Sequence, residues 1–275
     1  MQNYKLIVSD LDGTLLDSDM DLTSENLAAL KSISELGIVF AVSSGRTFFE
    51  IPRFVRDNPY IRFITYSNGS AVYDRLSNTD IISNRMVRSS VNKALDILSD
   101  YDCFIAIHAD GRCYIDRDIT FRDFDHFQMN DYYKSLFLTY DRVEGIENFA
   151  RAGDKVESIV LFFHSDEDLE KCSERIKDLD GVTLTSSIEH NIEICSSDAG
   201  KGKALSALAK ILNIQKQEII SVGDNMNDTS MFSESGLSLC TSNGIKDAKA
   251  LADKVICSND EGIAKYILDN VISKS

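Results

Sequence analysis

The chain lacks the segments that would place it in or across a membrane. None of its apolar runs approaches the roughly 20 residues that a membrane-spanning helix needs. Its first residues, Met1–Lys5, also lack the basic region and hydrophobic segment of a signal peptide. We therefore expect a cytoplasmic protein that makes no membrane contact.

Cysteine and histidine are present without the spacing that metal centres require. The six cysteines are dispersed, and no two of them form a Cys-x-x-Cys pair. Disulfide scaffolds and zinc sites depend on such patterns, so we expect buried, reduced thiols. The four histidines show no metal-ligand spacing either. Neither residue type predicts a metal site.

Basic residues are few. The chain holds 29 Lys and Arg against 44 Asp and Glu, for a net charge of -15. Nucleic-acid binding depends on Lys and Arg neutralising phosphates, so we expect no nucleic-acid partner. The charge does not exclude a small phosphorylated ligand, because a metal ion and one or two placed cations reverse the potential locally.

The sequence does contain short apolar runs, and these alternate with segments whose apolar residues recur at helical spacing. Residues 6–8 and 38–42 are continuous apolar runs, typical of strands buried in a parallel sheet. Between them, apolar residues recur at helical spacing from Leu27 to Leu36, and Gly37 ends that helix. Strand, helix and strand with short connections predict a right-handed crossover. We expect an α/β fold with a doubly wound, Rossmann-like parallel sheet.

The character of the chain changes after about residue 84, although no Pro/Gly-rich linker marks the change. The middle third predicts an α+β mixture of helices and antiparallel strands. We expect a core domain formed by 1–84 and 190–275, and an α+β lid inserted at 85–189. The polar lid residues of interest are His108, Arg112 and His126. The aromatic residues expected to form the interior of the lid are Phe121, Phe124, Phe127, Tyr132 and Tyr133.

Two carboxylates follow the first predicted strand. Asp10 and Asp12 are two residues apart, so in an extended backbone they face the same side. Crowded carboxylates repel unless a cation or hydrogen-bond donors intervene. The pair therefore predicts a divalent metal site, an acid/base couple or both, with a plain polar strand end as the alternative. A calcium loop is excluded, because its required Gly and Glu positions hold Leu15 and Asp21.

Further polar residues follow other predicted strands or open a helix. Ser44 and Arg46 lie after the second strand, and Asp224 and Asp228 lie after the strand at 218–222. In open parallel sheets ligands bind at the carboxyl ends of the strands. Taken alone, Ser44 also fits a helix cap, and the segment with Asp224 and Asp228 also fits an ordinary Asn/Asp turn.

Lys201 is at the start of a late predicted helix. A lysine there opposes the helix dipole unless an anion is near, which favours a functional role. A solvated surface lysine is the alternative for this residue in isolation.

The order of these motifs resembles the haloacid dehalogenase superfamily of phosphohydrolases. The large insert between the second and third motifs is similar to the Cof-type branch with an α/β cap, class IIB. Segments 67–69 and 258–262 also resemble that branch, whereas Ser242–Gly244 stands where its members usually carry Gly-Asn-Ala. The resemblance covers both core segments, and over the insert it is architectural only.

The resemblance implies roles for the carboxylates. Asp10 would be the nucleophile that forms an aspartyl-phosphate, and Asp12 the general acid and base. Mg²⁺ would be held by the Asp10 carboxylate, the Asp12 backbone carbonyl and Asp224, and Asp228 would orient its water shell. The residues that would bind the phosphate are Ser44, Gly45, Arg46, Lys201 and Asn227.

The implied function is a Mg²⁺-dependent phosphatase for small phosphomonoesters such as sugar phosphates, nucleotides or phosphorylated cofactors. Its partner would be a small phosphorylated metabolite, and the protein a monomer or weak homo-oligomer. Two alternatives stay open at this point. A phosphotransferase or phosphomutase would share the nucleophile and the metal, and a non-catalytic sensor would bind phosphometabolites without turnover.

Overall fold

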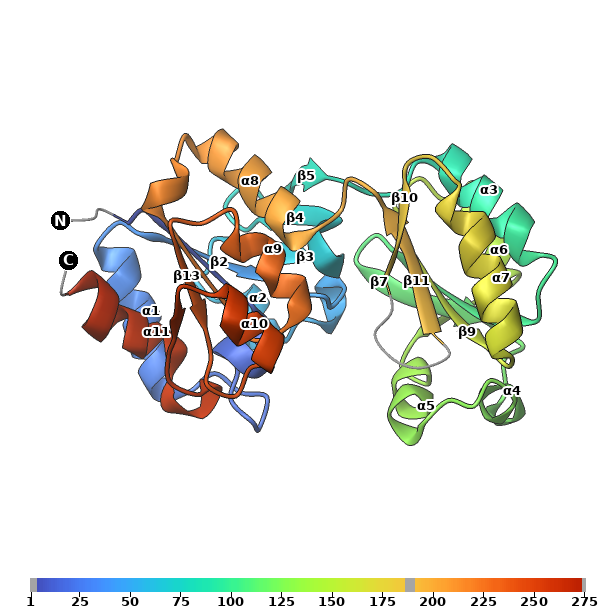
Figure 1. Cartoon of the computed structure of the whole chain (residues 1–275), viewed down its shortest axis with the longest axis horizontal. Helices are drawn as coiled ribbons and strands as arrows, with labels where there is room; N and C mark the ends of the chain where they lie inside the picture. The colour runs from blue at the N-terminus through green and yellow to red at the C-terminus, as the bar shows by residue number, and fades with distance from the viewer. Residues whose placement is uncertain (1–3, 186–190, 274–275) are drawn as a thin grey trace. The chain divides into compact units, whose positions relative to one another are not determined.

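The computed structural model describes residues 4–185 and 191–273. These residues form two compact units. The first comprises the chain up to residue 46, residues 51–83 and the chain from residue 200 on. The second comprises residues 47–50 and 84–199. Each unit is built around its own sheet (Figure 1).

The first unit contains a sheet of eight strands in the order β14-β13-β12-β1-β2-β3-β4-β5. β1 lies inside it and pairs in parallel with both β2 and β12. At one edge, β4 pairs antiparallel with both β3 and β5, and β4 and β5 form a hairpin. The predicted α/β class with a parallel sheet is confirmed. The strands are β1 (Leu6–Ser9), β2 (Val39–Ser43), β3 (Phe63–Tyr66), β4 (Ala71–Asp74), β5 (Thr79–Ser83), β12 (Ile219–Gly223), β13 (Leu237–Cys240) and β14 (Lys254–Val255).

Helices cover both faces of this sheet because successive strand residues point to opposite sides. Leu6 and Val8 pack with Leu205 and Leu208 of α8 on one face. α1 and α11 lie side by side (Figure 1), and α1 begins where the Thr23 side chain accepts a hydrogen bond from the Asn26 amide. The helices are α1 (Ser24–Glu35), α2 (Arg53–Arg56), α8 (Lys201–Leu212), α9 (Thr229–Phe232), α10 (Lys246–Leu251) and α11 (Ile263–Ile267).

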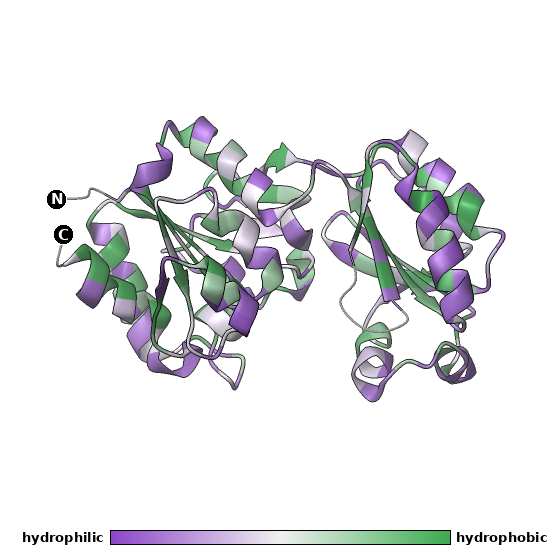
Figure 2. Cartoon of the chain, in the orientation of Figure 1, coloured by the Kyte–Doolittle hydropathy of each residue, from purple (hydrophilic) through white to green (hydrophobic). Residues whose placement is uncertain are grey.

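The second unit contains a six-stranded sheet in the order β10-β11-β9-β6-β7-β8. Figure 2 shows the apolar character of the strands in both sheets and the mixed character of the helices. One face packs against α3, α6 and α7, and part of the other packs an aromatic cluster from α4 and α5. The elements are β6 (Cys103–Ala109), β7 (Arg112–Asp116), β8 (Asp141–Val143), β9 (Val156–Phe163), β10 (Val182–Thr185), β11 (Asn191–Ser196), α3 (Arg88–Leu98), α4 (Phe121–His126), α5 (Asp131–Phe137), α6 (Ile146–Ala152) and α7 (Asp166–Lys177).

The division between the units differs from the predicted one in two places. β11 pairs with β9, so the chain before residue 200 belongs to the second unit, whereas the core was predicted to resume at 190. Residues 47–50, predicted as core, also belong to the second unit, where the Phe49 amide donates to the Gly111 carbonyl at 2.9 Å. Both differences come from pairings between distant parts of the chain.

Only some of the aromatic residues predicted to form the interior of the insert are buried there. Phe124 and Phe127 are buried in the cluster, and Tyr133 packs against it. Phe121 and Tyr132 are 60% and 68% exposed, so their placement was wrong. Adjacent residues on a helix point in different directions, so only some of a dense aromatic run reaches the interior.

The structure also bears on the membrane question. Among the described residues, no helix combines the length and the apolar character that crossing a bilayer requires.

Gly69 and Gly37 provide a matched test of packing inside the first unit. Both have a positive φ, at 93° and 77°. A Cβ on Gly69 would lie 2.4 Å from the Gly200 carbonyl oxygen, whereas one on Gly37 meets no atom within 4 Å among the described residues. We expect Gly37→Ala to lower the free energy of unfolding by about 1–2 kcal/mol from backbone strain. Gly69→Ala should lower it by a further ~1–3 kcal/mol from overpacking, measured by urea unfolding. Equal losses in the two variants would contradict this packing.

Candidate active site

Charged side chains converge at the carboxyl edge of the central strands of the first unit. Asp10 directly follows β1, and Asp224 directly follows β12. The Asp10 amide donates to the Val222 carbonyl at 2.9 Å, which joins the ends of these two strands. Because the strands are parallel, their carboxyl ends and the side chains after them share one edge.

Lys201 bridges two of these side chains. Its Nζ lies 2.6 Å from Asp10 Oδ1 and 2.7 Å from Asp228 Oδ1, and its side chain is 1% exposed. Burial lowers the pKa of Lys201, but Asp10 and Asp228 more than offset that effect and raise it. The buried group is therefore an ammonium ion held between two carboxylates.

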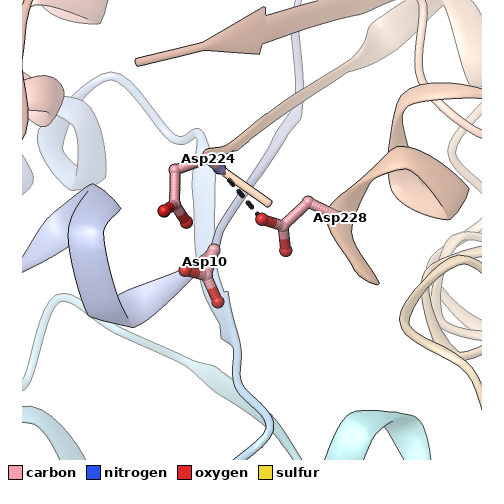
Figure 3. Close-up of side chains that lie close together, drawn as sticks. All are labelled: Asp10, Asp224 and Asp228. Carbon is pink, nitrogen blue, oxygen red and sulfur yellow. Dashed lines mark hydrogen bonds between the residues drawn. The ribbon is translucent and has the colours of Figure 1, made fainter. Parts of the chain in front are cut away.

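Three carboxylates form a compact group around this ammonium. One oxygen from each of Asp10, Asp224 and Asp228 lies within 4.8 Å of the others (Figure 3). Burial raises the pKa of Asp10 well above its usual range, and Asp228 and Asp224 add to the rise while Lys201 opposes it. Burial and Asp228 likewise raise the pKa of Asp224. One lysine does not balance the negative charge of this group.

Asp228 is fixed by its own loop. Its Oδ2 accepts hydrogen bonds from the backbone amides of Asp224 and Asn225, at 2.9 and 3.0 Å. Figure 3 shows the bond to the Asp224 amide as a dashed line. With Lys201 on Oδ1, both oxygens of Asp228 are engaged, and the carboxylates of Asp10 and Asp224 lie close to it (Figure 3).

Asp12 has a different partner from Asp10. The Arg46 guanidinium binds it in a fork, with Nε 2.8 Å from Oδ2 and Nη2 2.7 Å from Oδ1. Asp12 does not belong to the carboxylate group found among the described residues. The backbone leaves a regular conformation here, because Gly13 has a φ of 74°. Arg46 was predicted to bind the phosphate. In the structure it instead binds Asp12, the predicted general acid.

Ser44, Gly45 and Asn227 meet around a residue that the motif analysis gave no role. The Asn227 side-chain amide donates to Asn68 Oδ1 at 3.2 Å, and a Cβ on Gly45 would lie at the same distance from that oxygen. The buried Ser44 hydroxyl accepts from the Arg46 amide at 3.1 Å. Asn68 has a φ of 52°, which asparagine tolerates better than most residues. Its signal in the sequence was the Ser-Asn-Gly turn after the third parallel strand.

The segment that departs from the family pattern supports the turn after Asp12. Asn243 Nδ2 donates to the Gly13 carbonyl at 2.8 Å. A Cβ on Gly13 would lie 2.7 Å from Asp224 Oδ2, so only glycine allows this approach. Thr14 Oγ1 lies 3.4 Å from Asp224 Oδ1. Asn243 is therefore a site residue that motif reading missed, since its partner is 230 residues away.

Comparison with known proteins agrees with this geometry. A model of the haloacid dehalogenase-like hydrolase family matches residues 7–267, and the chain belongs to that family. Within it the chain is of the Cof type and is a phosphoric monoester hydrolase, as the motifs predicted.

Individual relatives match over nearly their whole length. A Bacillus subtilis protein named phosphatase YwpJ is 32% identical, over 98% of this chain and 100% of that protein. The B. subtilis 5-amino-6-(5-phospho-D-ribitylamino)uracil phosphatase YwtE is 27% identical over 98% of both chains. A crystal structure from Thermotoga maritima superposes with a TM-score of 0.81 at 24% identity, covering 98% of this chain and 97% of that one, which shows the shared fold.

Lys201 provides a test of the charge balance in the site. In Lys201→Met two buried carboxylates lose their cation, so we expect the free energy of unfolding to fall by about 3–5 kcal/mol at neutral pH. The loss should shrink at acidic pH, where the carboxylates are protonated. Lys203→Met, an exposed position on the same helix, is the control and should change stability little. A loss independent of pH would contradict the ion-pair assignment.

Proposed function

We propose that the protein hydrolyses small phosphomonoesters through an aspartyl-phosphate on Asp10, with Mg²⁺ as its cofactor. The observation that carries the proposal is the buried Asp10 carboxylate, bound by Lys201 and grouped with Asp224. A carboxylate paired with a buried ammonium is oriented, and the ion pair favours the anionic form that an attacking nucleophile needs.

The residues present fit a magnesium ion. Mg²⁺ prefers oxygen ligands and binds through one or two carboxylates together with substrate phosphate. Asp10 and Asp224 offer such carboxylates, and their raised pKa values indicate negative charge that a cation would stabilise. With the Asp12 backbone carbonyl they would hold the ion, and Asp228 would orient the loop and the water around it. The bound ion would neutralise charge on the phosphate during attack.

The remaining side chains support two chemical steps. Asp10 attacks phosphorus and the bond to the ester oxygen breaks, while Asp12 gives that oxygen a proton. Asp12 then takes a proton from the water that attacks phosphorus and releases Asp10. Lys201 stabilises negative charge beside Asp10 throughout. Ser44, Gly45 and Asn227, which meet around Asn68, are proposed to bind the phosphate oxygens.

The substrate is proposed to be a small phosphorylated metabolite. Relatives support this class, because two B. subtilis relatives are named as phosphatases of a phosphorylated ribitylamino-uracil. We propose that the second unit acts as the cap that selects the leaving group and excludes water during reaction.

Asp10→Asn tests the nucleophile. It should lower hydrolysis of p-nitrophenyl phosphate by a factor of about 10⁴ or more, because the neutral amide does not attack phosphorus. EDTA should abolish the wild-type rate and added Mg²⁺ should restore it. Asp57→Asn, an exposed carboxylate of the first unit, is the matched control and should leave the rate unchanged. Hydrolysis that survives Asp10→Asn would exclude Asp10 as nucleophile.

The raised pKa of Asp10 predicts how metal binding depends on pH. As pH falls through that raised pKa, Asp10 takes up a proton and its affinity for a cation falls. The increase in melting temperature caused by Mg²⁺ should therefore shrink as the pH is lowered from neutral toward acid. Without metal, Asp10 should make the folded protein more stable as the pH falls, because the folded state binds this proton more tightly than the unfolded chain does. Thermal denaturation with and without Mg²⁺ measures both, and a Mg²⁺ effect that grows toward acid pH would contradict the assignment.

A further inference from the structure

Three backbone carbonyls in the loop after β1 each accept a hydrogen bond from an asparagine side chain. The donor and acceptor residues are Asn243 and Gly13 at 2.8 Å, Asn26 and Leu15 at 3.0 Å, and Asn259 and Leu16 at 3.0 Å. This loop carries Asp12, the proposed general acid and base. Two of the asparagines lie 230 and 243 residues along the chain from their acceptors. The proposed hydrolysis gives none of the three asparagines a role.

Two of these side chains also accept a hydrogen bond. Asn243 Oδ1 accepts from the Asn259 backbone amide at 3.0 Å. Asn26 Oδ1 accepts from the Ala264 amide at 2.9 Å. An amide side chain donates from its nitrogen and accepts at its oxygen, whereas an ionised aspartate of almost the same shape only accepts. The variant Asn243→Asp would therefore keep the bond from Asn259 and lose the bond to Gly13.

The two backbone amides that hold these asparagines come from one stretch of the chain, residues 259–264. It overlaps segment 258–262, which resembles the family in the sequence but had no assigned role. Asn26 and Asn259 are both buried, so their bonds are shielded from competing water. The Ser18 amide donates to Asp260 Oδ1 at 2.8 Å, which adds a contact just beyond the loop. The late stretch therefore holds the Asp12 loop at several points.

The bond from Asn243 acts on the residue next to Asp12. Gly13 has a φ of 74° and a ψ of 3°, and glycine turns freely about both angles. A hydrogen bond to its carbonyl restricts that turn and hence the placement of the Asp12 backbone. Arg46 holds the carboxylate of Asp12 by its fork. Asp12 is therefore fixed at both its backbone and its side chain, as a group that must reach the ester oxygen needs to be.

We propose that Asn243 is a positioning residue for Asp12. It acts by fixing the turn at Gly13, and residues 259–264 hold it in place. The inference rests on the proposed function, because it concerns the proton that Asp12 gives to the ester oxygen. A displaced Asp12 would slow this proton transfer more than it slows the attack of Asp10 on phosphorus. The loss should therefore depend on how strongly the leaving group needs a proton.

Two aryl phosphates of similar shape separate this role from a general loss of structure. p-Nitrophenolate leaves readily without a proton, whereas phenolate is a stronger base and gains more from one. We expect Asn243→Asp to lower kcat/KM for phenyl phosphate about tenfold more than for p-nitrophenyl phosphate. Partial unfolding would lower both values by the same factor. Equal losses, or no loss, would overturn the proposal.

Asn213→Asp is the matched control, because it likewise changes an exposed amide of the first unit to a carboxylate. Asn213 lies at the opposite end of α8 from Lys201, and its φ of 54° is one that aspartate tolerates. We expect the ratio of the two kcat/KM values to equal that of the wild type. The same shift of the ratio in both variants would assign it to the added charge and overturn the role of the hydrogen bond.

Hydrogen exchange tests the hold on the loop without any turnover. We expect the backbone amides of residues 11–16 to exchange about tenfold faster in Asn243→Asp than in the wild type. Peptides from β9, in the second unit, should exchange at an unchanged rate and serve as the reference. Unchanged exchange in the loop would overturn the proposal. A wild type that hydrolyses neither aryl phosphate would instead contradict the proposed function, and the exchange rates would still decide whether Asn243 holds the loop.

Discussion

The ion pairs of Lys201 are the interaction on which the site depends. They join residues 191 and 27 positions apart and bring the end of β1, the loop after β12 and the start of α8 to one place. Charged groups removed from water are stable only when they are paired and hydrogen-bonded. These ion pairs hold the start of α8 close to α9. Gly202 makes this approach possible, since a Cβ there would lie 2.3 Å from the Ser230 carbonyl oxygen.

The same cluster explains how an acidic chain handles an anionic substrate. The net charge of -15 is spread over the molecule, whereas binding responds to the potential within a few ångströms. Lys201 compensates part of the charge of Asp10, Asp224 and Asp228, but burial and the two neighbouring carboxylates still raise the pKa of Asp10. A divalent cation would complete it. The same cation would then balance the charge of the carboxylates and attract the phosphate of the substrate.

Local pattern predicted the elements of the first unit better than those of the insert. Buried parallel strands such as β1 and β2 are continuous apolar runs, which stand out in any sequence. In β11, polar and apolar residues alternate, and its pairing with β9 depends on contacts between distant residues. The boundary predicted at residue 190 was therefore misplaced. Phe121 and Tyr132 fit an aromatic interior by composition, but the direction of each on its helix decided their exposure.

The sequence by itself determined the chemistry that the protein carries: Asp10 and Asp12 after one strand, Asp224 and Asp228 after another, and glycines where backbones approach closely. Tertiary structure alone decided which of these groups are partners. Arg46 binds Asp12, Asn227 donates to Asn68, and Asn243 donates to the turn after Asp12. The physical reason is that hydrogen bonds and ion pairs act over a few ångströms, and only the folded sheets bring such distant residues that close.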